Sequence, residues 1–114
     1  MEYSAAHALA AAIQHSDEYK DYHQYKLEAM ADETTAALIK EYRKLQMALQ
    51  IAAMSGKAPD ETDKQRFSGI STLLFTKPEV SQFLLSEMRL QQTMSDVFKI
   101  ITDAAGIEMA LPGE

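Results

Sequence analysis

Apolar residues recur at helical spacing over an unusually long stretch near the end of the chain, residues 78–105. Two neighbouring rows at seven-residue steps contain Phe83, Leu90, Val97, Ala104, Val80, Met94 and Ile101. Pro78 suits a first helical turn, and Gly106 can adopt the left-handed conformation that closes a helix. This pattern predicts a helix about 42 Å long. Its apolar stripe is wide enough to require a partner surface.

A second long helix is predicted over residues 33–54, with Asp32 as its cap and Ser55-Gly56 as its end. Its apolar residues follow steps of four and three and form a heptad-like seam: Leu38, Tyr42, Leu45 and Leu49. The seam is too short for a free-standing coiled coil. We therefore expect this third helix to pack antiparallel against the helix over 78–105.

Shorter helices are predicted over residues 4–14, 17–30 and 61–75, with Ser16 and Asp60 as caps for the last two. The inner face of the fourth helix is expected to contain Phe67, Ile70, Ser71 and Leu74. Gly69 predicts tight packing or fraying there, because glycine weakens a helix interior. The fold class is all-α, with about five helices. A long antiparallel helical hairpin of the third and fifth helices has the shorter helices packed across it, in a single helical domain over 1–106 with a C-terminal tail over 107–114.

The composition of the chain excludes several kinds of functional site. The 114 residues contain no cysteine, which excludes disulfides, thiolate zinc sites, cysteine-bound iron–sulfur clusters and a cysteine nucleophile. The formal net charge is −6, and the densest basic group, Lys40, Arg43 and Lys44, is interleaved with Glu41 on a helix and is interpreted as a solvated face. Direct nucleic-acid binding is therefore not expected. No run of 18 apolar residues or basic leader is present, so we expect a cytoplasmic protein without a membrane span.

Candidate catalytic chemistry is sparse. His7, His15 and His23 are eight residues apart, which does not place them on one helical face as metal ligands require. Glu87 interrupts the apolar rows of the last helix, and we interpret it as an ion-pair partner of Arg43 or Lys44. A functional carboxylate is the alternative. We expect no enzyme and assign no catalytic, cofactor-binding or metal-binding residue.

Candidate interaction residues are more numerous. Tyr19, Tyr22 and Tyr25 recur at three-residue spacing, either as a recognition patch or as the rim of a core. Met47 and Met88 fall outside the main seams, where a flexible thioether suits an adaptable binding surface. Wide apolar stripes on so thin a chain leave surface uncovered, which predicts a homodimer or a larger assembly.

Three segments, taken together, resemble the YlbF/YmcA family of small bacterial helical proteins, which also includes YheA. They are HSDEYKDYHQYKLEAM (15–30), TTAALIKEYRKLQMALQ (34–50) and SEMRLQQTMSDVFKIITDA (86–104). The resemblance implies a self-associating regulatory protein without catalysis. Some members modulate mRNA processing by ribonuclease Y and influence competence, sporulation and biofilm formation.

Not every property of the family is expected of this chain. Members with the ribonuclease role use cysteines for iron–sulfur ligation, and this chain has none, so no cofactor is expected and the YheA branch is the nearer likeness. The expected partners are the protein itself, paralogous helical proteins or ribonuclease Y. The alternative hypothesis is a small-ligand- or metal-binding helical bundle that uses Glu87 and a histidine.

Overall fold

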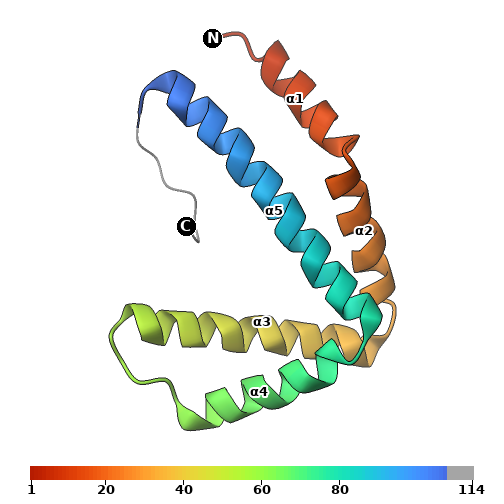
Figure 1. Cartoon of the computed structure of the whole chain (residues 1–114), viewed down its shortest axis with the longest axis vertical. Coiled ribbons are helices and arrows are strands. Elements are labelled where there is room, and N and C mark those ends of the chain that lie inside the picture. The colour runs from red at the N-terminus through yellow and green to blue at the C-terminus, as the bar shows by residue number, and fades with distance from the viewer. Residues whose placement is uncertain (108–114) are drawn as a thin grey trace. The chain divides into compact units, whose positions relative to one another are not determined.

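The computed structural model describes residues 1–107, and within that range the chain forms five helices (Figure 1). They are α1 (Ser4–Gln14), α2 (Asp17–Ala29), α3 (Glu33–Met54), α4 (Glu61–Phe75) and α5 (Pro78–Ala105). The predicted all-α class and the helix boundaries are confirmed, with α2 ending one residue early. Most of the predicted tail, 108–114, lies outside the described residues.

Polar side chains start the helices as the sequence predicts. The Ser16 hydroxyl accepts the Tyr19 backbone N–H at 3.3 Å, and the Asp32 carboxylate accepts that of Thr35 at 3.0 Å. Asp60 accepts two backbone N–H groups in the first turn of α4. Each bond satisfies a donor that has no partner inside the helix.

Two glycines end the long helices. Gly56 follows α3 and Gly106 follows α5, and both have φ of 71°, a conformation that residues with a Cβ adopt only at a cost. Gly69 differs, because it lies inside α4, and a Cβ added there would meet no described atom within 4 Å beyond its chain neighbours and the backbone of its own helix. The expectation of tight packing at Gly69 is therefore wrong, and α4 continues through it.

The chain divides into two compact units. One, the terminal unit, joins Met1–Gln24 to Leu84–Glu114, and the other, the central unit, is Tyr25–Phe83.

The central unit is built on a hairpin of α3 and α4, which lie side by side (Figure 1). Its buried apolar residues come from four helices: Ala29, Ile39, Leu45, Leu74, Val80 and Phe83. The helix packed along α3 is thus α4, whereas the sequence pattern indicated the fifth helix. The short connection over 55–60 brings α4 back directly, and its aromatic side chains cover the seam of α3.

The first turns of α5 also belong to the central unit. Lys77, just before α5, is close enough to Asp32 at the start of α3 to act on its carboxylate. Farther along both helices, the Arg43 guanidinium carbon lies 5.5 Å from the centre of the Phe83 ring. Both interactions join the start of α5 to α3 within the central unit.

The terminal unit has a much smaller apolar core than the central unit. Among its described residues the buried ones are polar, Ser86 and Thr102, whereas Leu90 and Val97 on α5 are only half-buried. Among the residues of α1, all of them described, none is buried. Little of the apolar surface of this unit is removed from water by its own helices.

Candidate interaction surfaces

The predicted seam of α3 faces α4, and we call Leu38, Tyr42, Leu45 and Leu49 the inner seam. Leu45 is buried and the other three are half-buried. The Tyr42 ring stacks on Phe67 of α4, with centroids 5.0 Å apart and an interplanar angle of 18°. Such a pair stabilises by about 1 kcal/mol beyond the area it buries. The inner seam is therefore occupied within the chain.

An ion pair crosses the same hairpin. The Arg66 guanidinium of α4 donates to the Glu41 carboxylate of α3 at 2.6 Å. Both side chains are partly exposed, at 55% and 30%, so the pair orients the hairpin more than it stabilises it. The sequence shows Glu41 among basic residues but does not indicate which residue it pairs with. Nothing in the spacing along the chain indicates a pair 25 residues apart.

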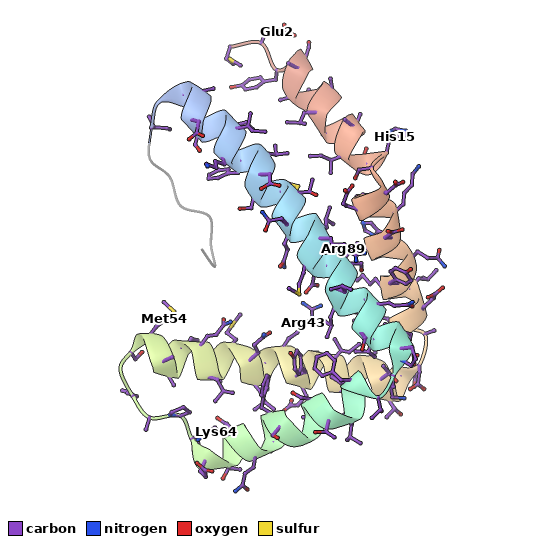
Figure 2. The ribbon with its side chains drawn as sticks, viewed as in Figure 1. Glu2, His15, Arg43, Met54, Lys64 and Arg89 are labelled. Carbon is purple, nitrogen blue, oxygen red and sulfur yellow. The ribbon has the colours of Figure 1, made fainter. Side chains whose placement is uncertain are left out.

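A different face of α3, opposite α4, is uncovered. We call this face the outer seam; its members, at steps of three and four, are Ala37, Lys40, Lys44, Met47, Ile51 and Met54. The exposed fractions of Met47, Ile51 and Met54 are 63%, 56% and 87%. Figure 2 shows Met54 on the side of α3 that faces away from α4.

Of the outer seam, only Met47 was predicted from the sequence to face a partner. Lys40 and Lys44 were interpreted as part of a solvated face, which hid the regular spacing that joins them to the three apolar residues. A second heptad-like repeat on the same helix is the signal that could have revealed it. The outer seam has basic residues towards the start of α3 and apolar ones towards its end.

The predicted seam residues of α5 divide by exposure. Phe83 is buried in the central unit, while Leu90 and Val97 are half-buried in the terminal unit. Met94 and Ile101 are 45% and 52% exposed. The last two therefore do not belong to the core of an isolated chain, and their assignment to an interface stays a prediction.

The exposed side of α5 carries further apolar side chains. Met88, proposed as partner-facing, is 64% exposed, and Leu85 and Ile100 are exposed as well. Gln92 donates through Nε2 to the Asp96 carboxylate at 2.9 Å, one turn farther along. The exposed side of α5 therefore begins with apolar side chains and carries acidic ones farther along.

The three predicted tyrosines are half-buried rather than fully exposed. The rings of Tyr19 and Tyr22 lie 4.2 Å and 5.0 Å from the ring of His23, centre to centre. The Tyr25 side chain belongs to the central unit and is also half-buried. Tyr19 and Tyr22 contact a ring on their own helix. Neither the recognition patch nor the core rim is excluded by this placement.

A cavity of about 160 Å³ in the terminal unit is lined by Asp17, Glu18 and Asp21 of α2 and by Ser86 and Arg89 of α5. Three carboxylates beside one guanidinium give it an acidic lining. Throughout residues 1–107, however, no group of three or more His, Asp or Glu side chains is arranged to hold a metal ion. The cavity therefore offers no support for the metal-binding hypothesis.

Of the candidate residues of that hypothesis, His7, His23 and Glu87 lie on different helices. The Nδ1 atom of His15 lies 2.7 Å from the carbonyl oxygen of Ala11 in its own helix, and His23 packs against tyrosines. Glu87 is half-buried on α5, and its role as an ion-pair partner or a functional carboxylate stays a prediction. No helix in the described range is long and apolar enough to cross a membrane.

Comparisons with known proteins agree with the fold and the resemblance. The chain is 29% identical over 107 residues to a UPF0342 protein of Symbiobacterium thermophilum, covering 94% of this chain and 96% of that one. It is 31% identical to a UPF0342 protein of Alkalihalophilus pseudofirmus over 101 residues, covering 89% and 86%. A solved protein of unknown function (DUF964) from Bacillus stearothermophilus has the same fold, with a TM-score of 0.72, 18% identity and 91% of each chain covered.

The family comparison extends over almost the whole described chain. Residues 3–105 match the family described as "Control of competence regulator ComK, YlbF/YmcA". The match includes all five helices and both seams of α3. The chain therefore belongs to the YlbF/YmcA family.

Proposed function

We propose that this protein is a non-enzymatic interaction module that self-associates and acts in regulation. The proposal rests on the number of hydrophobic side chains that are exposed, compared with the number that are buried. Among the described residues, fourteen large hydrophobic side chains are exposed and six hydrophobic residues are buried. Contiguous exposed apolar surface on a small protein is typical of an interaction site.

The regular spacing of these residues supports a helical partner surface. Met47, Ile51 and Met54 follow the three-and-four spacing by which helices pack side by side. Methionine suits such a surface because its side chain adapts to the shape of its partner. Self-association is the first expected interaction, and the cytoplasm is the expected location.

The regulatory part of the proposal rests on family membership. The matching family is described by its control of the competence regulator ComK. We propose a role in such developmental control, through a paralogous helical protein or ribonuclease Y. The absence of cysteine sets this chain apart from members that hold an iron–sulfur cluster, so any such role proceeds here without one.

The test is affinity purification of the tagged protein from its native cells after crosslinking, followed by mass spectrometry. The control is a tagged helical protein of similar size and charge from outside the family. Recovery of a paralogous helical protein or ribonuclease Y, absent from the control, is the expected result. Recovery of the protein alone would contradict the regulatory partner while leaving self-association standing.

A further inference from the structure

The outer seam of α3 has a charge pattern that limits what can cover it. Lys40 and Lys44 occupy its first half, and Met47, Ile51 and Met54 occupy its second half, all exposed. From Lys44 to Met54 the seam extends about 15 Å at 1.5 Å per residue. A matching helix needs a carboxylate at one end and apolar side chains at the other, about the same distance apart.

The exposed side of α5 offers that pattern in the reverse direction. Leu85 and Met88 come first, Gln92 follows, and Asp96 and Asp103 lie farther along. From Asp96 back to Leu85 is about 16.5 Å of helix. Lys99 lies between the two acids, so this end carries two negative charges and one positive charge. The charges and the apolar residues match only when the two helices are antiparallel.

The outer seam has no covering helix in the single chain. Met47, Ile51 and Met54 are each more than half exposed there. A second copy of the chain offers a helix of the required pattern, its own α5.

We propose that the outer seam of α3 binds α5 of a second copy of this chain in antiparallel orientation, with Lys44 facing Asp96. In this register Ile51 faces Met88, and Met54 faces Leu85. Two-fold symmetry makes the contact twice in a dimer, because each chain offers both helices. This inference rests on the proposed self-association and adds the surface, the register and the residue pairs.

The first test is an exchange of charge between Lys44 and Asp96, followed by sedimentation. Lys44→Glu and Asp96→Lys are each expected to raise the dimer dissociation constant about tenfold, since each places like charges together at two symmetric contacts. The double variant restores the attraction with reversed signs and returns the constant to within about threefold of the starting protein. Lys20→Glu, an exposed change on α2, is the control and leaves association unchanged.

The second test determines the register and uses the absence of natural cysteine in the chain. A mixture of Ile51→Cys and Met88→Cys proteins is expected to form a disulfide-linked heterodimer under mild oxidation. Neither protein alone forms it efficiently, and Ile51→Cys mixed with Ile100→Cys is the mismatched control. Ile100 is far along α5 from the position that Ile51 faces.

The outcomes separate this inference from the function it rests on. A protein that sediments as a monomer throughout contradicts self-association itself. A dimer that shows neither charge rescue nor the 51–88 crosslink overturns the antiparallel α3–α5 contact and leaves self-association intact. Rescue together with the selective crosslink supports both.

Discussion

At the scale of single residues, the caps and the core follow from side-chain chemistry that the sequence displays. Asp32 and Asp60 accept N–H groups where a short acid precedes a helical pattern, and Leu74 is buried on the predicted inner face of α4. The Glu41–Arg66 pair was not predicted, because it depends on how two helices meet. Helix caps and buried positions could be predicted from the local sequence, whereas contacts between helices could not.

The carboxylate of Asp32 makes stability depend on pH in a specific direction. Hydrogen bonds from the hydroxyl and backbone N–H of Thr35 lower its pKa from the ordinary value of 3.8, with a smaller contribution from Lys77. A lowered folded-state pKa contributes stability above that value, and the contribution is lost as pH falls through the folded-state pKa. Asp32→Asn keeps a capping oxygen that does not titrate.

Thermal unfolding of the two proteins between about pH 7 and pH 2 checks this prediction. The melting temperature of the natural protein is expected to fall more steeply in acid, below about pH 4, than that of Asp32→Asn. Superimposable profiles would show that the Asp32 cap does not contribute to the acid dependence.

Two adjacent leucines of α4 provide a matched comparison of burial. Leu74 is fully buried, whereas Leu73 is 57% exposed. Leu74→Ala is expected to reduce the free energy of unfolding by about 2–5 kcal/mol through lost burial and a cavity. Leu73→Ala is expected to change it by about 0.5 kcal/mol or less. Chemical denaturation measures both, and equal losses would contradict the orientation of α4.

At the scale of elements, apolar periodicity predicted where helices lie better than which helices pair. The steps of four and three in α3 indicated a seam but not the helix that covers it. Several helices of the chain carry compatible stripes, and the short connection over 55–60 favoured α4. The outer seam was missed because its lysines resemble an ordinary solvated face.

Two glycines, one inside α4 and one just after α3, are expected to change stability in opposite directions when replaced by alanine. Gly69 lies inside α4 with open space around it among the described residues, so Gly69→Ala is expected to stabilise by about 0.5–1 kcal/mol. Gly56 has a φ of 71°, so Gly56→Ala is expected to destabilise by about 1 kcal/mol. Denaturant midpoints measure both changes. A loss of stability in Gly69→Ala would mean that a partner surface packs closely there.

At the scale of the whole molecule, many of the apolar residues of the chain are not buried within a single copy. The central unit has a compact core, but within residues 1–107 the buried residues of the terminal unit are a serine and a threonine. The outer seam and the exposed side of α5 remain uncovered in one chain. Association follows as the physical means of covering them.

Sedimentation velocity of the intact protein across about 1–100 µM tests the central claim most directly. The account predicts a species of at least twice the chain mass of 12.7 kDa, becoming dominant as concentration rises. A single species of 12.7 kDa over the whole range would contradict it.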